Sequence, residues 1–108
     1  MNEEVIKEGK TAAITSYILF IGVLIALSMN SETRNRFAAF HIRQALGLTI
    51  AFFSLGLIVS NFDNLMITFS MWVFIFVLWS YGFMSAIQGK TTEIPLLGKW
   101  FQKVFQFI

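Results

Sequence analysis

One short stretch, residues 36–47, holds the side chains best suited to chemistry or to specific contacts. It includes His41, the single histidine of the chain, and Gln44, which follows about one helical turn later. In a helix these two side chains share a face with Phe37 and Phe40, because residues three and four apart lie on the same side. We interpret this face as a docking surface for the C-terminal segment of the chain or for a partner protein. A polar side chain at the level of the lipid headgroups is the alternative interpretation of His41.

Catalytic side chains are sparse in this sequence. The chain has no cysteine and one histidine, and its long apolar segments contain no carboxylate. General acid–base catalysis needs two titratable groups close together, and the candidates are Glu32 and Glu93 in predicted turns. A metal site needs several histidine, cysteine or carboxylate ligands, which His41 alone does not supply. We therefore predict no enzymatic activity, no catalytic residue, no metal site and no cofactor, and a proton relay through His41 lacks a carboxylate partner.

The composition is that of a membrane protein. Of the 108 residues, 56% are hydrophobic, 13% are charged and 13 are phenylalanines, and the mean hydropathy is +0.70. Soluble domains contain about 25% charged residues, so we expect lipid, rather than a protein core, to cover the apolar surface. The net charge of +2 is too small to predict binding to nucleic acid. We expect one membrane domain, residues 1–108.

Long charge-free stretches predict three transmembrane helices. The stretches contain 21, 19 and 26 residues, and about 20 apolar residues cross a bilayer. We place a polar N-terminal segment at 1–11, span 1 at 12–29, span 2 with its amphipathic beginning at 37–62, and span 3 at 64–89. A cleaved signal peptide is the alternative for span 1, but three glutamates precede it, whereas signal peptides begin with positive charge.

The C-terminal segment 95–108 has the pattern of a helix that lies in the membrane surface. Its 14 residues are too few to cross a bilayer. Large apolar side chains recur on one side, while Lys99 and Lys103 lie on the other, as in interfacial amphipathic helices. We expect its anchors to be Trp100, Phe101 and Phe105. The predicted fold is an all-α integral membrane protein with three transmembrane helices plus a C-terminal amphipathic interfacial helix.

The distribution of positive charge predicts the orientation in the membrane. With three spans, the first turn and the C-terminal tail lie on one side of the bilayer and the N-terminus lies on the other. The N-terminal side carries Lys7 and Lys10, and the other side carries the six cations Arg34, Arg36, Arg43, Lys90, Lys99 and Lys103. Cytoplasmic loops are enriched in Lys and Arg, so we predict a cytoplasmic C-terminus and an external N-terminus. The six cations also suit anionic lipid headgroups.

Two blocks of sequence resemble a known family. One is Phe-x-x-Phe-His-x-x-Gln-Ala at residues 37–45, and the other is Ala-Ile-x-Gly at 86–89 with Pro-Leu-Leu-Gly at 95–98. Together they resemble the small bacterial membrane proteins related to the Tic-type twenty-kilodalton import subunit of the chloroplast inner envelope, labelled import component proteins in bacteria. The resemblance implies an all-helical, multi-pass protein of the bacterial inner (cytoplasmic) membrane and, for the plastid relatives, a part in protein translocation.

The resemblance assigns positions rather than chemistry. It covers most of the chain from Tyr17 to Gly98 and falls on Phe40, His41, Gln44, Gly89 and Pro95, without a chemical role for any of them. The plastid subunit has four spans, whereas this sequence predicts three, and this departure argues against a pore formed in the same way.

The predicted function is a non-enzymatic accessory or scaffold subunit of a membrane complex, with a link to protein translocation implied by the resemblance. The expected partners are the lipid bilayer and other membrane proteins or further copies of the chain. A homo-oligomeric channel or small-solute transporter is the alternative function. It requires polar stripes on the spans, and the candidates are Thr15, Ser16, Thr49 and Thr68.

Overall fold

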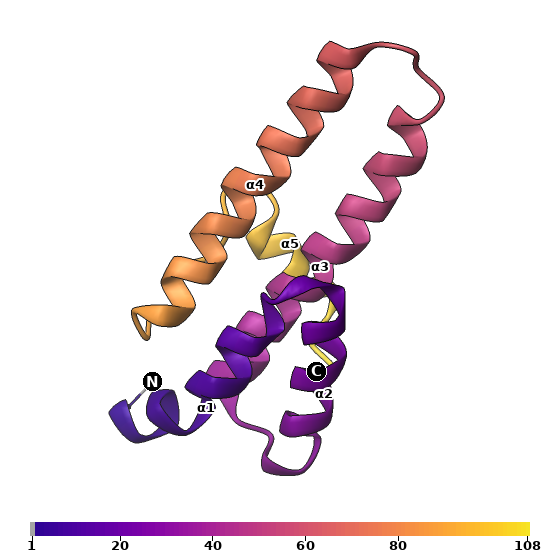
Figure 1. Ribbon diagram of the computed structural model, residues 1–108. Helices are drawn as coiled ribbons and strands as arrows, with labels where there is room; N and C mark the ends of the chain where they lie inside the picture. Colours follow the sequence, from indigo (N-terminus) through magenta and orange to yellow (C-terminus); the bar gives the residue numbers. More distant parts are fainter. Residues whose placement is uncertain (1) are drawn as a thin grey trace.

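The computed structural model describes residues 2–108, without the side chains of Leu19 and Phe20. Every regular element of this part is a helix: α1 Glu3–Ser16, α2 Leu19–Thr33, α3 Arg36–Val59, α4 Leu65–Ile87 and α5 Gly98–Val104. Figure 1 shows α3 and α4 as a long antiparallel hairpin, with α1, α2 and α5 against the part of it away from the α3–α4 turn. The molecule is elongated, with principal extents of 49 × 22 × 22 Å.

Polar caps begin the two long helices, and no proline interrupts them. The side chain of Asn35 accepts a hydrogen bond from the N–H of Ala38 (3.0 Å), and Asn64 does the same for Met66 (2.9 Å). Such caps satisfy N–H groups that the start of a helix leaves free. At 1.5 Å per residue, the 24 residues of α3 and the 23 of α4 span about 36 and about 35 Å. Both helices are long and apolar enough to cross a membrane.

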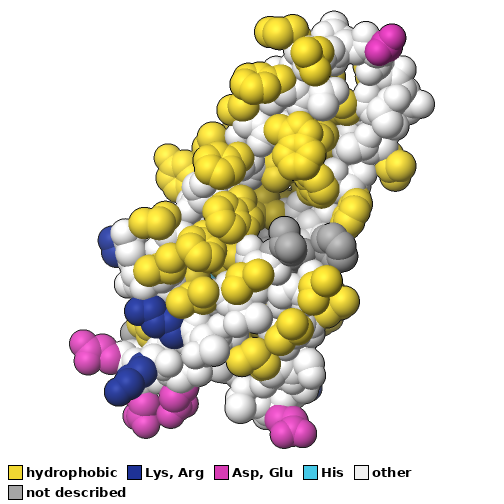
Figure 2. Space-filling view, viewed as in Figure 1, with side chains coloured by type: hydrophobic (Ala, Val, Ile, Leu, Met, Phe, Trp, Pro, Cys, Tyr) yellow, Lys and Arg dark blue, Asp and Glu magenta, His cyan; other side chains and the backbone are white. Residues whose placement is uncertain are grey.

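The half of the α3–α4 hairpin nearest its turn exposes large apolar side chains. Leu57 and Leu65 are 73% and 83% exposed, and Phe69 is 64% exposed. Figure 2 shows hydrophobic side chains spread over this half of the visible face. Contiguous apolar surface of this extent is typical of a membrane-facing or partner-facing region.

The predicted span 1 is two helices, so the prediction of three transmembrane helices is wrong. Among the described residues, two helices meet the length and hydropathy of a span. The chain turns at Tyr17 and Ile18, whose N–H groups bond to the carbonyls of Ile14 (3.1 Å) and Thr15 (3.0 Å). The resulting helices, α1 with 14 residues and α2 with 15, are about 21 to 23 Å long. That is shorter than a bilayer's hydrocarbon core of about 30 Å.

The turn allows α1 to pack along α3 through a face of small residues. The buried residues of α1 are spaced as one helical face: Gly9, Ala12, Ala13 and Ser16. Small residues let two helix backbones approach closely. Asn35 adds a hydrogen bond from its amide nitrogen to the carbonyl of Val5 (2.8 Å). The segment predicted as a polar N-terminus, 1–11, therefore contains most of α1, which begins at the cap Asn2.

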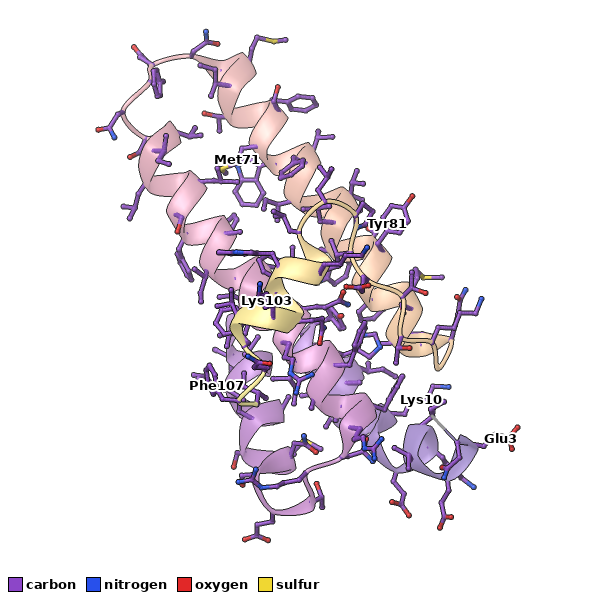
Figure 3. All side chains as sticks on the ribbon, turned by 180° about the vertical axis from the view of Figure 1, so that it is seen from behind. Glu3, Lys10, Met71, Tyr81, Lys103 and Phe107 are labelled. Carbon is purple, nitrogen blue, oxygen red and sulfur yellow. The ribbon has the colours of Figure 1, made fainter. Side chains whose placement is uncertain are left out.

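After α4 the chain reverses and comes back along α3. Gly89 makes the reversal with a φ of +72°, a left-handed conformation that glycine adopts without strain. We name residues 90–97 the return segment. The return segment leads into α5, which lies across α3 (Figure 3). The labelled Lys103 belongs to α5. The ring of Phe101 packs directly on Gly47, where a Cβ atom would overlap it.

The tail helix differs from the interfacial helix predicted at 95–108. α5 has seven residues, because a turn closed by the N–H of Leu97 and the carbonyl of Pro95 (2.8 Å) precedes it. Phe101 is 2% exposed and Phe105 is half-buried, so both pack on the protein core instead of serving as the predicted lipid anchors. Trp100, by contrast, is 59% exposed.

Polar contacts also bind the tail to α3. Arg43 donates from Nε to the carbonyl of Phe105 (3.1 Å) and from Nη1 to the side chain of Gln102 (3.2 Å). Gln102 in turn donates to the carbonyl of Phe40 (2.8 Å). Arg43, which was predicted to meet lipid headgroups, thus binds its own chain. The other five predicted headgroup cations are exposed: Arg34, Arg36, Lys90, Lys99 and Lys103.

Charge divides the molecule into two halves. Every charged residue except Asp63 lies within residues 3–43 or 90–103, and Asp63 lies in the α3–α4 turn. On the face shown in Figure 2, the charged side chains gather at the end away from that turn, apart from one acidic side chain at the turn itself. We name these parts the charged half and the apolar half, and Figure 1 places both chain ends in the charged half.

Candidate functional site

A buried network of hydrogen bonds joins Tyr17, His41 and Gln44 in the charged half. The hydroxyl oxygen of Tyr17 lies 2.8 Å from Nδ1 of His41, and it accepts a hydrogen bond from Nε2 of Gln44 at 3.0 Å. None of the three side chains is more than 2% exposed. Because Tyr17 belongs to the α1–α2 turn and the other two belong to α3, the network ties that turn to the long hairpin.

The protons of this network have one consistent arrangement. Nε2 of His41 lies 2.8 Å from the carbonyl oxygen of Lys90, and a carbonyl only accepts, so Nε2 carries the proton. In the neutral imidazole Nδ1 is then an acceptor, and the hydroxyl of Tyr17 donates to it. We assign this tautomer from the hydrogen-bond partners. Both ring nitrogens of His41 are thus committed to contacts within the chain.

Burial keeps the hydroxyl of Tyr17 protonated. Desolvation raises the pKa of Tyr17 above the ordinary value of 10.0, and the hydrogen bond from Gln44 opposes this with a smaller effect. A hydroxyl whose pKa lies above 10 remains a donor throughout the physiological range. Deprotonation of Tyr17 therefore does not interrupt its contact with His41 at neutral pH.

The same part of the molecule holds the return segment in place. Oε1 of Gln44 accepts the N–H of Ile94 (2.7 Å). The hydroxyl of Ser85 donates to the carbonyl of Lys90 (2.8 Å) and accepts the N–H of Thr92 (3.1 Å). Buried backbone groups need hydrogen-bond partners, and for these groups of the return segment side chains of α3 and α4 supply them.

A side chain of α4 donates a hydrogen bond to the backbone of the α1–α2 turn. Nε1 of Trp79 donates to the carbonyl of Tyr17 (2.7 Å). The Tyr17 ring lies against Gly82, where an added Cβ atom would come within 2.6 Å of the ring. A helix break in apolar surroundings is stable only if its backbone groups are paired. Trp79 therefore pairs a backbone carbonyl of the turn, and the missing side chain at Gly82 leaves room for the ring of Tyr17.

The residues predicted as a docking face lie inside the chain. Phe37, His41 and Gln44 are buried and Phe40 is half-buried. The rings of Phe37 and Phe40 lie edge-on to the imidazole, with centroids 4.8 and 5.1 Å from that of His41. His41 and Gln44 contact the return segment that precedes α5, and α5 itself bonds to the carbonyl of Phe40. At 0% exposure, His41 and Gln44 are accessible neither to a partner protein nor to lipid headgroups.

Three further residues belong to this site and were not predicted from the sequence as members of it: Tyr17, Trp79 and Ser85. A buried tyrosine or tryptophan usually pairs its polar atom, and Tyr17 lies in a long, mostly apolar stretch without charged residues. The position of Tyr17 in this stretch could have indicated that its hydroxyl group needs a buried hydrogen-bond partner. Ser85 has no comparable signal, because its role depends on a chain reversal that follows it by several residues.

Comparisons with models of protein families, with curated proteins and with solved structures gave no match for this chain. The resemblance to the Tic-type family therefore stays a prediction. The function must be argued from the site itself.

The hydrogen-bond network is suited to a structural role, because its polar groups bind other parts of the same chain. Within residues 2–108, each buried side-chain nitrogen or oxygen has a hydrogen-bond partner. In the same range, no three histidine, aspartate or glutamate side chains are grouped to hold a metal ion. The network joins one helix break and one return segment to two long helices, and this is an arrangement suited to a rigid support.

Proposed function

We propose that this chain is a two-span protein of the bacterial inner membrane, in which α3 and α4 cross the bilayer and both termini face the cytoplasm. The observation that carries the proposal is the division between the apolar half and the charged half. Charged side chains are costly in the hydrocarbon interior. The stretches 44–62 and 64–89 contain no charged residue, and Asp63, which separates them, lies in the turn that joins the helices.

Positive charge supports this orientation. With two spans, all eight Lys and Arg residues lie on the side of the termini, and the α3–α4 turn contributes none. Cytoplasmic segments are enriched in these residues. Three spans predicted an external N-terminus, whereas two spans predict a cytoplasmic one. Lys7 and Lys10 argued against the three-span orientation, and they agree with the two-span orientation.

α1 and α2 form a helical hairpin that enters the membrane from the cytoplasmic side without crossing it. The exposed side chains of α2 are apolar over much of its length, with Ile21 at 55%, Leu24 at 65% and Ile25 at 48%. Irregular backbone is tolerated at membrane depth when it is covered by protein. The hydrogen bond from Trp79 to the carbonyl of Tyr17 gives the turn of this hairpin such cover.

The role that this framework supports best is that of a non-enzymatic accessory or scaffold subunit of a membrane complex. His41 and Tyr17, the buried side chains with the most reactive groups, bind segments of their own chain. The polar residues required for a channel or transporter path instead donate to carbonyls of their own helices: Thr15, Ser16, Thr49 and Thr68. This pattern is common for hydroxyl groups inside helices, and it favours the scaffold over the channel.

Photo-crosslinking in cells, combined with tagged isolation in mild detergent, tests the scaffold role. A photoreactive residue is placed at Leu24 in α2, at Trp100 in α5 and at Leu65 near the α3–α4 turn, all of which are exposed. We expect one protein partner to be crosslinked at a defined position and recovered in the isolated complex. Monomers crosslinked only to lipid at all three positions would contradict the scaffold role. Ion or solute conductance by the reconstituted protein would establish the channel alternative.

We propose protein translocation as the process that the complex serves. This part of the proposal rests on the resemblance of residues 37–45 and 86–98 to the Tic-type family. Recovery of a translocation component, or of a precursor in transit, as the crosslinked partner would support it. A reproducible partner from an unrelated pathway would remove it and leave the scaffold role intact.

A further inference from the structure

Two open hollows lie along one exposed side of α4, and we name the pair the groove. One hollow, of about 420 Å³, is lined in part by Val73, Phe74 and Val77, and the other, of about 340 Å³, is lined in part by Tyr81, Met84 and Lys90. Residues 73, 77, 81, 84 and 88 follow one another at steps of three and four, so the two hollows lie on the same side of the helix. One hollow therefore lies in the apolar half and the other lies in line with it at the end of α4.

The two ends of the groove differ in polarity. The hollow nearer the α3–α4 turn is lined by apolar side chains and Ser70. The hollow at the end of α4 has one charged residue in its lining, Lys90, together with polar and apolar neighbours: Ser80, Tyr81, Met84, Ser85, Gln88 and Thr92. No carboxylate lines either hollow among the described residues. Tyr81, 53% exposed, projects from α4 (Figure 3) and lines the hollow at the end of this helix.

The positive end of the groove is held in a defined place. The carbonyl of Lys90 accepts hydrogen bonds from His41 (2.8 Å) and Ser85 (2.8 Å), and the N–H of Thr92 donates to Ser85 (3.1 Å). The buried network thus fixes the backbone that presents the lysine and the threonine. An exposed ammonium group on a fixed backbone, near the polar residues Gln88 and Thr92, is a suitable partner for a phosphate group.

We propose that this groove binds one anionic phospholipid of the cytoplasmic leaflet. Its phosphate contacts Lys90 and Thr92, and its acyl chains lie along Met84 and Val77. The distance along α4 from Gln88 to Val77 is about 16 Å at 1.5 Å per residue, close to the roughly 15 Å of one leaflet's hydrocarbon. The proposal rests on the two-span membrane location proposed above.

Lipid binding to the purified full-length protein tests the site. Flotation with vesicles of phosphatidylcholine and phosphatidylglycerol first establishes that the protein is inserted. Native mass spectrometry from detergent, with equal amounts of the two lipids, then measures their retention. We expect preferential retention of phosphatidylglycerol, and a loss of its affinity of about fivefold in Lys90→Gln, the effect of one cation at a membrane surface. Lys99→Gln is the matched control, because Lys99 is exposed and outside the groove.

A second variant tests the groove apart from its charge. Met84→Trp fills the hollow and is expected to weaken the retention of both lipids, with helix content checked by circular dichroism. Equal losses in Lys90→Gln and Lys99→Gln would overturn the proposal in favour of general charge attraction. A Met84→Cys variant that forms disulfide dimers in membranes would overturn it in favour of a second copy in the groove. Inserted protein that does not prefer phosphatidylglycerol overturns the lipid site alone, whereas failed flotation overturns the two-span location as well.

Discussion

The hydroxyl group of Tyr17 lies 2.8 Å from Nδ1 of His41, and this contact joins the turn between α1 and α2 to α3. Tyr17 also accepts a hydrogen bond from Gln44 through its hydroxyl and one from Trp79 through its carbonyl. One residue thus connects the break in the N-terminal apolar stretch with both long helices. The loss of its hydroxyl group is expected to loosen the α1–α2 hairpin while α3 and α4 stay helical.

Tyr17→Phe should therefore destabilise the protein. The substitution leaves Nδ1 of His41 and an amide N–H of Gln44 unpaired in the interior, and each unpaired buried group costs about 1–3 kcal/mol. Thermal and denaturant unfolding in detergent measure the loss. Tyr81→Phe is the control, because Tyr81 is 53% exposed. Equal stability of the two variants would show that the Tyr17 hydroxyl does not support the hairpin.

Gln44→Leu should release the return segment. Leucine has no acceptor for the N–H of Ile94, so local opening around Lys90 becomes more frequent and trypsin cleaves there about tenfold faster. Fragments are identified by mass spectrometry after limited digestion. Gln106→Leu, at an exposed position of the tail, should leave the rate at Lys90 unchanged. The same rate in both variants would contradict the role of Gln44.

The fold was predictable from the sequence where a single uncharged, apolar stretch forms a single helix. The stretches around α3 and α4 are uncharged, and polar turns bound them, so both were located to within a few residues. Span 1 was placed by the same criterion and is wrong, because hydropathy does not reveal a helix break inside an apolar stretch. The informative pattern was the small-residue face that includes Gly9 and Ala13, which indicates packing on a helix rather than on lipid.

The site was predictable only in part for a related reason. His41 and Gln44 stood out as polar residues at the start of a span, and their spacing placed them on one face. Their contacts depend on where Tyr17 and the return segment lie, and both positions result from chain reversals. A reversal of this kind is set by tertiary packing, such as the ring of Tyr17 on Gly82, which single-sequence patterns do not contain.

Gly47→Leu should displace the tail, whereas Gly56→Leu should not. A Cβ atom at Gly47 overlaps the ring of Phe101, while at Gly56 nothing lies within 4 Å of it. Both substitutions add the same side chain to α3, so they alter helix propensity and hydropathy equally. Loss of α5 packing is measured as faster trypsin cleavage at Lys103, which lies on α5. Tail cleavage that rises equally in the two variants would contradict the α5–α3 contact.

High pH should unfold the protein through Tyr17. The chain has two tyrosines, so in a Tyr81→Phe background the tyrosinate absorbance reports Tyr17 alone. Because the pKa of Tyr17 is raised in the fold, the unfolded chain releases its proton near the ordinary value of 10.0 while the folded chain retains it. The contribution of Tyr17 to stability should therefore be constant below about pH 10 and decline above it. Titration of folded Tyr17 at its ordinary value would contradict its burial.

The two-span topology is tested most directly by the accessibility of single cysteines, because the chain has none of its own. Cysteines replace Glu4 in α1, Asn61 in the α3–α4 turn and Phe107 in the tail, all exposed positions. Intact spheroplasts are treated with a membrane-impermeant maleimide, and a permeabilised sample serves as the control. We predict labelling at position 61 from outside, and labelling at positions 4 and 107 only after permeabilisation. Labelling at both 4 and 61 from outside, with 107 protected, would show three spans and contradict the account.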